Sequence, residues 1–432
     1  MTELERIVTA VPGPRSRALA AELAAYEAPG VTYLGEDYPV FWESAAGALV
    51  TDVDGNRYLD LTSAFGVAAT GHTNPRVARA IADQAQRLMH GMGDVHPTEL
   101  RTQLLARLAK LAPGDLRKSY LATSGAEAVE FALKTALLAT GRPRVLAYHG
   151  AYHGLSLGAL EVIGIDKFRA PFAPLVPARA TFLPYPGADA TLDGALGAVR
   201  TALAHDPDIG AIILEPIQGR GGVIVPPPGF LRALRALCDE RGLLLILDEI
   251  YTGFGRTGTM FACERERVVP DLLCVGKALG GGVPLSATIG TPRVMDAWPV
   301  SAGEAIHTST FLGNPLACAA ALANLDEIER LDVAGRVRAR EAALGARLRA
   351  LAPYPSVRDV RGVGFLWAVE FAHAAFANRV VVRGLALGVI LLQSGATGTS
   401  ITIAPPLTIE DDQLARALDV FERAVRDTEE HA

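Results

Sequence analysis

Two short apolar runs that each deliver one charged residue constrain the fold of this chain more than any other feature. Leu243–Leu247 is continuously aliphatic and ends in Asp248-Glu249, and Leu272–Gly276 leads into Lys277 and a glycine-rich turn. Continuously apolar strands are typical of a parallel sheet that is covered on both faces. We therefore expect Asp248 and Lys277 at the carboxyl edge of an open α/β sheet, where ligands bind.

Further apolar runs of strand length alternate with helical stretches between about residues 75 and 320. The other expected strands lie at Ser119–Ala122, Arg144–Tyr148, Ile209–Leu214 and Ser286–Gly290. Strands that alternate with helices predict an α/β fold with a mostly parallel sheet flanked by helices. We assign residues 63–320 to this large domain.

The two ends of the chain mix helix and strand and are expected to form a smaller domain together. Val40–Leu61 alternates between polar and apolar residues around a turn, as a hairpin does, and a final helix begins near Ile409. We predict that the N-terminal segment, residues 1–62, and the C-terminal segment, residues 321–432, build one smaller α+β domain.

Composition argues against several classes of function. The chain has 432 residues, and its net charge of −6 is unclustered, which gives no electrostatic reason to expect a nucleic-acid partner. No run approaches the roughly 18 apolar residues of a membrane helix, and the N-terminus lacks the apolar core of a secretory signal. The four cysteines and nine histidines show no metal-ligand spacing, so we expect free thiols, no metal site and a cytoplasmic location.

A lysine and an aspartate brought together at a sheet edge suit one cofactor, pyridoxal 5'-phosphate (PLP). The Lys277 amine can condense with the aldehyde of the cofactor, and the Asp248 carboxylate can keep the pyridinium nitrogen protonated. The protonated ring withdraws electrons from the bound substrate and weakens its Cα–H bond. Lys277, once displaced by the substrate, can then move the proton as general base and acid.

Three neighbouring motifs each allow two interpretations. Ser124-Gly125-Ala126 opens a helix, where backbone N–H groups attract a phosphate, although Ser-Gly there is also an ordinary N-cap. Tyr152-His153 lies between glycine-containing turns and either stacks on a heterocyclic ring or packs within the turn. Glu215 ends a strand and either supports the site from behind or belongs to a buried ion pair.

Two longer motifs complete the set. Asp248–Gly258 is dense in glycine directly after an aliphatic strand, which favours a tight loop over a site. His307–Pro315 is a hydroxyl-rich turn before a helix; its hydroxyls can bind a phosphate, but the sequence alone favours a helix cap.

Together these motifs resemble those of the class III, or omega-type, aminotransferases among the fold-type I PLP enzymes. The resemblance runs from Asp52–Asp60 to Pro405-Pro406-Leu407, and Glu215–Pro284 is its most specific part. It implies a PLP-dependent aminotransferase that moves an amino group between an amine or (omega-)amino acid and a 2-oxo acid. The implied mechanism is ping-pong, through an aldimine with the catalytic lysine.

The resemblance also implies a role for each matching residue. Lys277 would carry PLP, Asp248 would bind its pyridine nitrogen, and Tyr152 and Ile250 would lie on the two faces of its ring. Thr310 would reach the phosphate in a neighbouring subunit, which implies a homodimer with shared active sites; a tetramer also fits. The other residues expected at the cofactor are Ser124, Gly125, Ala126, His153, Glu215 and Tyr251.

The sequence departs from the family pattern where substrates bind. Leu155 and Thr402 stand where many relatives carry arginine, and Tyr251 replaces a glutamine that often contacts the phenolic oxygen of the cofactor. Arg220 stands where relatives often carry an acidic residue. A guanidinium is the usual partner of a carboxylate, so we hypothesise that Arg220 binds the carboxylate of the substrate. The alternative is that Arg220 faces solvent or pairs with a surface carboxylate.

Two rival functions share these motifs. An amino-acid racemase or epimerase on the same scaffold would differ only in the face on which the proton returns to Cα. A non-catalytic PLP-binding regulatory domain is the third class, and the intact pair of Lys277 and Asp248 counts against it.

Overall fold

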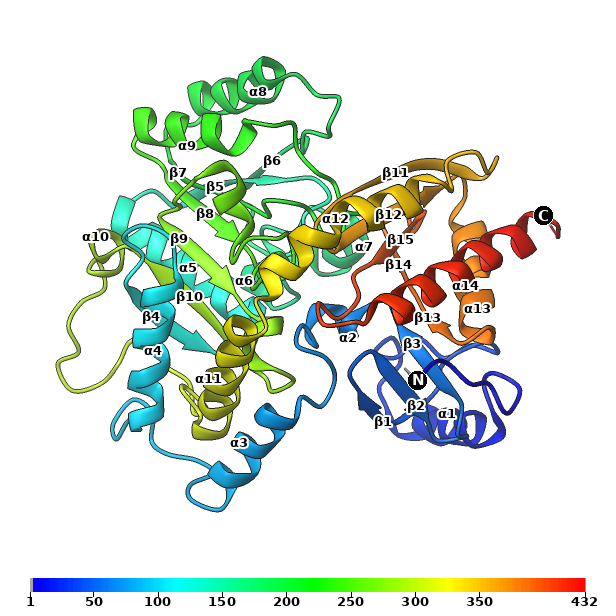
Figure 1. Ribbon diagram of the computed structural model, residues 1–432. Helices are drawn as coiled ribbons and strands as arrows, with labels where there is room; N and C mark the ends of the chain where they lie inside the picture. The colour runs from blue at the N-terminus through cyan, green and yellow to red at the C-terminus, as the bar shows by residue number, and fades with distance from the viewer. Residues whose placement is uncertain (1–2, 432) are drawn as a thin grey trace.

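The computed structural model describes residues 3–431, and a seven-stranded sheet forms the centre of its larger part (Figure 1). The strand order is β4-β10-β9-β8-β7-β5-β6. Neighbouring strands from β9 to β6 are parallel, whereas β10 is antiparallel to β4 and β9. The strands are β4 (Lys118–Ala122), β5 (Arg144–Tyr148), β6 (Ala180–Leu183), β7 (Ile209–Leu214), β8 (Leu244–Asp248), β9 (Leu272–Val275) and β10 (Ser286–Gly290). The predicted α/β fold with a mostly parallel sheet is confirmed, and β6 is a strand that the sequence patterns did not indicate.

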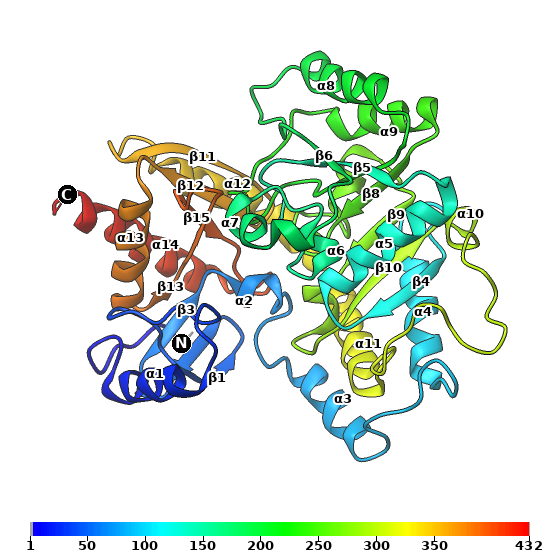
Figure 2. The ribbon, with the colours of Figure 1, turned by 180° about the vertical axis from the view of Figure 1, so that it is seen from behind.

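Helices cover both faces of this sheet, as the side chains of β8 show. Leu245 and Leu247 pack in one hydrophobic cluster, and Leu244 and Ile246 pack in another. The first cluster includes residues of α8 (Leu192–His205) and α9 (Phe230–Arg241), and the second includes residues of α5 (Gly125–Thr140). Seen from behind, α5 crosses in front of the strands (Figure 2). Because successive side chains of a strand point to opposite faces, an unbroken aliphatic strand suits this double cover.

The remaining helices of the large part lie beyond the sheet and at its edges. Helix α11 contacts both α3 and α4 next to the sheet (Figure 1). The bounds are α3 (Pro75–Ala85), α4 (Glu99–Leu111), α6 (Leu157–Leu160), α7 (Asp166–Arg169), α10 (Pro292–Met295) and α11 (Pro315–Arg330), with 3₁₀ turns η1 (Ala170–Leu175), η2 (Ala262–Glu266) and η3 (Lys277–Gly280).

The smaller part combines both ends of the chain in two four-stranded sheets. One sheet has the order β1-β2-β3-β13, and in it Leu59 of the N-terminal segment pairs with Val389 of the C-terminal segment. The other has the order β11-β12-β15-β14. The strands are β1 (Trp42–Ala46), β2 (Leu49–Asp52), β3 (Arg57–Asp60), β11 (Val357–Val363), β12 (Leu366–Phe371), β13 (Val389–Ile390), β14 (Leu392–Ser394) and β15 (Ser400–Ile403). The residue limits of the predicted domains, 62 and 320, stay a prediction.

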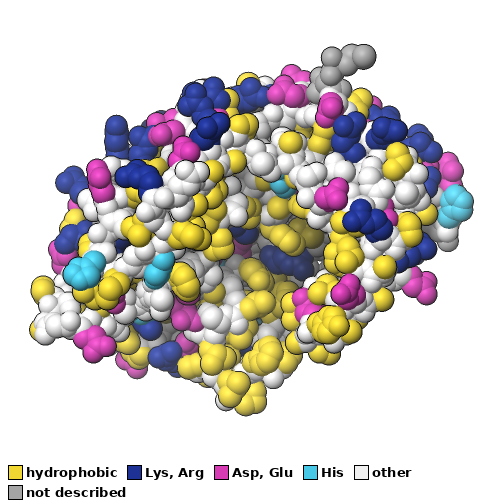
Figure 3. All heavy atoms as spheres, turned by 90° about the horizontal axis from the view of Figure 1, so that it is seen from below, with side chains coloured by type: hydrophobic (Ala, Val, Ile, Leu, Met, Phe, Trp, Pro, Cys, Tyr) yellow, Lys and Arg dark blue, Asp and Glu magenta, His cyan; other side chains and the backbone are white. Residues whose placement is uncertain are grey.

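Helices of both chain ends accompany these two sheets, and the first lies beside the N-terminal strands (Figure 1). They are α1 (Pro14–Tyr26), α2 (Ser63–Gly66), α12 (Val333–Arg349), α13 (Ala374–Ala386) and α14 (Asp411–Glu429). No helix among residues 3–431 is both long and apolar enough to cross a membrane. The face seen from below is hollowed near its centre, with hydrophobic side chains around the hollow and Lys or Arg in its depth (Figure 3).

Candidate active site

The parallel strands β8 and β9 end side by side and bring Asp248 and Lys277 to one edge of the sheet. Gly276 between β9 and Lys277 cannot carry a side chain, because a Cβ there would lie 2.4 Å from Ser286 Oγ. Lys277 itself has a φ of 45°, an uncommon conformation for a residue with a Cβ that occurs at functional sites. Burial lowers the pKa of Lys277 to about 8, against the opposing charges of Asp248 and Glu215. A larger fraction of the amine than of an ordinary lysine is therefore neutral near physiological pH, and the neutral form is the nucleophile.

The carboxylate of Asp248 is oriented by two donors. His153 Nδ1 lies 2.7 Å from one carboxylate oxygen, and the Ile250 N–H donates to the other at 3.0 Å. Burial opposes protonation of His153, but the hydrogen bond to Asp248 and its charge outweigh burial and raise the pKa of His153. His153 therefore serves as a donor that fixes the direction of Asp248.

Glu215 connects two loops behind this pair. One carboxylate oxygen accepts the Tyr152 N–H at 3.0 Å, and the other accepts the Gly219 N–H at 2.8 Å. Burial raises the pKa of Glu215 to about 7, with the charge of His153 opposing. Of the two interpretations of Glu215, the structure favours support of the site over a direct ion pair, because both hydrogen-bond donors to its carboxylate among the described residues are backbone N–H groups.

Tyr251 stands beside Lys277, where its ring lies 3.8 Å below the lysine Nζ. Two glycines form the slot for this ring: a Cβ on Gly66 would lie 2.5 Å from its Cε2, and a Cβ on Gly219 would lie 2.3 Å from its Cδ1. Burial raises the pKa of Tyr251 to about 12, so the phenol keeps its proton. Its buried hydroxyl has no hydrogen-bond partner among the described residues, which leaves a donor free for a ligand.

The start of α5 lies against Ile250. A Cβ on Gly125 would lie 2.8 Å from Ile250 Cδ1, so glycine allows this close approach. Ser124 is the N-cap, and its Oγ accepts the Glu127 N–H at 3.2 Å. Among the described residues, the N–H groups of Gly125 and Ala126 have no acceptor. The cap and the anion site are thus compatible, since capping uses a different N–H.

Arg220 lies next to this site and contacts the smaller part of the molecule. Its Nη1 donates to the Gln393 carbonyl at 2.9 Å, and its own carbonyl accepts the Gly395 N–H at 3.0 Å. Burial raises the pKa of Tyr152, and the nearby Arg220 charge acts against this rise. The hydrogen-bond partner of the guanidinium among the described residues is a carbonyl oxygen, not the surface carboxylate of the alternative interpretation.

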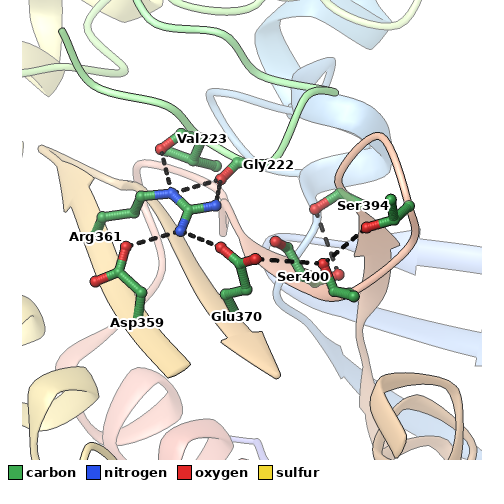
Figure 4. A network of polar contacts seen from close by, with 9 residues as sticks. Gly222, Val223, Asp359, Arg361, Glu370, Ser394 and Ser400 are labelled. Carbon is green, nitrogen blue, oxygen red and sulfur yellow. Dashed lines mark hydrogen bonds and ion pairs between the residues drawn. The ribbon is translucent and has the colours of Figure 1, made fainter. Parts of the chain in front are cut away.

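Arg361 holds the loop that carries Arg220 (Figure 4). Its Nη2 donates to the Gly222 carbonyl at 2.7 Å and its Nε to the Val223 carbonyl at 3.2 Å. The same guanidinium forms ion pairs with Asp359 and Glu370 on β11 and β12. The loop after Gly219 is thus tied to the smaller sheet.

Thr402 and Thr310 are two further positions that the sequence analysis singled out. Thr402 Oγ1 lies 2.6 Å from Ser394 Oγ, so a hydroxyl pair occupies the place of the arginine in relatives. Thr310 is exposed on the turn before α11, and no hydrogen bond among the described residues joins its side chain to the other site residues. Within one chain, the structure brings together the predicted residues from Ser124 to Lys277 but not Thr310.

Arg256 and Ser63 support the site, and the sequence patterns did not single them out. Arg256 is 2% exposed and donates to Ser63 Oγ at 2.9 Å and to the Phe365 carbonyl at 3.2 Å. Ser63 begins a left-handed turn that ends at Gly66, with positive φ at all four residues. This turn holds Gly66 against Tyr251. In the sequence, Arg256 appears only as one charged residue within a glycine-rich run. Such a local pattern does not reveal contacts with distant residues.

The fold and this site define a class of enzyme, and comparison with known families identifies it. The family model described as aminotransferase class-III matches residues 33–425, so the chain belongs to this family. The protein is a PLP-dependent aminotransferase, as the chemistry of Lys277 and Asp248 suggested.

Three solved structures are similar over nearly the whole chain. A thermostable (S)-enantioselective omega-transaminase from Thermomicrobium roseum is 29% identical, with a TM-score of 0.89 over 96% of this chain and 99% of that chain. The ornithine aminotransferase of Toxoplasma gondii is 31% identical, with a TM-score of 0.87 over 96% of each chain. A PLP-bound amine transaminase from an uncultivated Pseudomonas species is 30% identical, with a TM-score of 0.86 over 93% of this chain and 98% of that chain.

The residues present fit PLP on the chemistry of their donors. The site offers a half-buried lysine amine of lowered pKa, a carboxylate oriented at a strand end, and, at the start of α5, two N–H groups without an acceptor among the described residues. These correspond to the aldehyde, the ring nitrogen and the phosphate of the cofactor.

Proposed function

We propose that Lys277 and Asp248 are the catalytic residues of this aminotransferase and that its substrates are an amine or omega-amino acid and a 2-oxo acid. The observation that carries the proposal is the placement of a half-buried lysine and an oriented carboxylate at the ends of the adjacent strands β8 and β9. When the cofactor is bound, Ser124, Gly125 and Ala126 would hold its phosphate, and Tyr152 and Ile250 would pack against its ring.

The residues of this chain divide the work. When bound, PLP supplies an electron sink that weakens a bond at the amine-bearing carbon of the substrate. Lys277 Nζ takes the proton from that carbon and later returns it, which its lowered pKa favours. Asp248 would accept a hydrogen bond from the ring nitrogen of the cofactor, and His153 keeps the carboxylate in position. Glu215 holds the loops that carry Tyr152 and Arg220.

Arg220 is the proposed partner of the substrate carboxylate. Its guanidinium donates to the Gln393 carbonyl through Nη1, and four of its five N–H donors have no acceptor among the described residues. A buried carboxylate without a partner is costly, and this cation meets that need next to the site.

The active unit is proposed to be a homodimer in the cytoplasm, with Thr310 reaching the phosphate held by the other subunit. Exposed apolar side chains gather in two segments around Thr310, and the rings of His90 and Phe311 join these segments at 5.2 Å. The exposed apolar residues are Leu88, Met89, Met92, Val95, Ile306 and Phe311. Such a patch is typical of a subunit interface. The four free cysteines fit a reducing compartment.

The function is tested by the half-reaction. Single amines and amino acids are added to the purified enzyme, and the absorbance of the bound cofactor is followed while the products are separated by chirality. Conversion of the cofactor to its amine form identifies a donor and supports transamination. Inversion of the substrate without such conversion would identify a racemase instead.

The role of Thr310 is tested with mixed dimers of one Lys277→Ala chain and one Thr310→Ala chain. If Thr310 acts across the interface, the working site combines an intact Lys277 with the intact Thr310 of the other chain. That site then binds PLP with wild-type affinity and gives half of the wild-type activity. Weakened PLP binding in the mixed dimer would instead place Thr310 in the site of its own chain.

A further inference from the structure

The amine of Lys277 lies over the face of an aromatic ring. Its Nζ is 3.8 Å from the centre of the Tyr251 ring. At that distance the nitrogen lies over the face, because the hydrogens of the ring occupy its plane. The face of an aromatic ring is negative and attracts an ammonium group that lies within about 6 Å of the ring centre. The Tyr251 ring therefore favours the protonated form of the amine.

The hydroxyl of Tyr251 takes no part in this contact. Its oxygen is buried and forms no hydrogen bond with any of the described residues, so Lys277 is not its partner. Burial raises the pKa of Tyr251 to about 12, so the phenol is neutral and places no negative charge beside the amine. The contact with Lys277 is therefore made by the ring alone.

The Tyr251 ring is held in place by backbone from two separate segments. A Cβ on Gly66 would lie 2.5 Å from its Cε2, and a Cβ on Gly219 would lie 2.3 Å from its Cδ1, so glycine is needed at both positions. The ring also packs against the apolar cluster that contains Ile217 and Val363. A ring held in this way keeps its position relative to the amine.

The charged groups around Lys277 leave the ring as a contact for its ammonium form. Burial lowers the pKa of Lys277 to about 8, whereas the charges of Asp248 and Glu215 act against burial. The charge of Arg256 lowers this pKa further. Asp248 pairs with His153, and Glu215 accepts backbone N–H groups. Helix α2, which contacts η3, has no charged residue.

We propose that the face of the Tyr251 ring holds Lys277 in its ammonium form between the proton transfers of the reaction. Nζ takes the proton of the substrate with its lone pair, and the electron pair of the broken C–H bond passes to the electron sink. Nζ then carries a positive charge until it gives the proton up. The ring stabilises this charge without accepting the proton. Tyr251 is thus a positioning residue that acts through Lys277, and its role rests on the proposed function.

The first test separates the charge distribution of the ring from its hydroxyl and its bulk. Tyr251 is replaced by phenylalanine and by pentafluorophenylalanine, which have nearly the same shape, although the fluorine atoms make the ring face repel a cation. Apo-enzyme is acetylated with traces of acetic anhydride over a range of pH, and peptide mass spectrometry measures the reaction of each lysine, since only the neutral amine reacts. The other lysines are all exposed and serve as internal controls: Lys110, Lys118, Lys134 and Lys167.

We expect Tyr251→Phe to keep the wild-type midpoint of Lys277 and the fluorinated ring to lower that midpoint by about one pH unit. The midpoint falls because the ammonium form loses its stabilisation and releases its proton at lower pH. Equal midpoints with the two rings would overturn the proposal even if Lys277 is catalytic and the aminotransferase is active. A shift in Tyr251→Phe as large as that with the fluorinated ring would assign the effect to the hydroxyl and overturn it as well.

The second test asks whether the reaction uses this contact. We expect kcat of the fluorinated holoenzyme to be up to about tenfold below that of Tyr251→Phe with an unchanged KM, since a weaker base removes the proton more slowly. Deuterium at the carbon that loses the proton should lower kcat at least as much as it does in Tyr251→Phe. An unchanged kcat with a shifted midpoint would overturn the role of the ring in proton transfer. A wild-type enzyme that converts no amine would refute the proposed function, whereas a shifted midpoint would still establish the ring contact.

Discussion

The two ends of the active site are built in different ways. At the cofactor end, buried strand ends carry Asp248 and Lys277, and a hydrogen bond from His153 fixes the carboxylate. At the carboxylate end, Arg220 lies on a glycine-rich loop that is attached to the smaller sheet through Arg361 and Gln393. At the first end Asp248 and Lys277 match the family motifs, whereas the second end departs from them at Leu155 and Thr402. Residues on the rigid sheet thus carry out the steps that all substrates share, whereas residues on loops determine which substrate binds.

Replacing Lys277 should have the largest effect on the cofactor end. We expect Lys277→Ala to reduce kcat by about 10⁴-fold, because the general base and acid is removed, while circular dichroism shows an intact fold. Borohydride reduction of the wild type followed by peptide mapping should attach the cofactor to Lys277. Lys110→Ala, on the exposed face of α4, serves as the control. Attachment to another lysine would contradict the assignment.

Asp248→Asn should have the next largest effect. An amide does not hold the ring nitrogen protonated, so we expect kcat to fall by about 10²- to 10³-fold while bound cofactor remains visible in the absorbance spectrum. His153 also loses its ionic partner, so its pKa should fall, which NMR titration of the imidazole can follow. Near-wild-type turnover in this variant would remove Asp248 from the catalytic residues.

At the carboxylate end, Arg220→Met should act on binding more than on turnover. We expect KM for 2-oxo acids to rise about tenfold and KM for amines without a carboxylate to rise less, since the former lose a charged hydrogen bond. The carbonyl of Arg220 still accepts the Gly395 N–H in this variant, so the loop keeps its attachment. Equal increases for both substrate types would show that Arg220 is structural, and that the two ends of the site do not divide the work as proposed.

The same contrast explains how much the sequence predicts. Unbroken aliphatic runs such as Leu244–Leu247 reveal a strand buried on both faces, and the residue after such a run lies at the edge where ligands bind. The placements of Asp248 and Lys277 follow from local patterns. The contacts of Arg256 with Ser63 and of Arg361 with Gly222 join residues far apart in the chain, and no local period encodes them. The polar cavity lined by Lys167, Arg220 and Gln393 depends on three such distant segments and therefore becomes visible only in the fold.

The smallest expected effect concerns the pH dependence of PLP capture by Lys277, which can first be measured on the wild type. Burial lowers the pKa of Lys277 to about 8, so the protonated amine predominates below pH 8 and the neutral amine above it. The rate at which apo-enzyme captures PLP should therefore rise by up to about tenfold per pH unit below pH 8 and level off above pH 8. PLP itself also titrates, so the same pH series with a simple amine in place of the enzyme gives the correction. The Asp248 charge raises the pKa of Lys277, so Asp248→Asn should move the midpoint to lower pH. Arg220→Met, at the other end of the site, should move it less. A midpoint near the ordinary lysine value of 10.5 would show that Lys277 is solvated in the apo-enzyme.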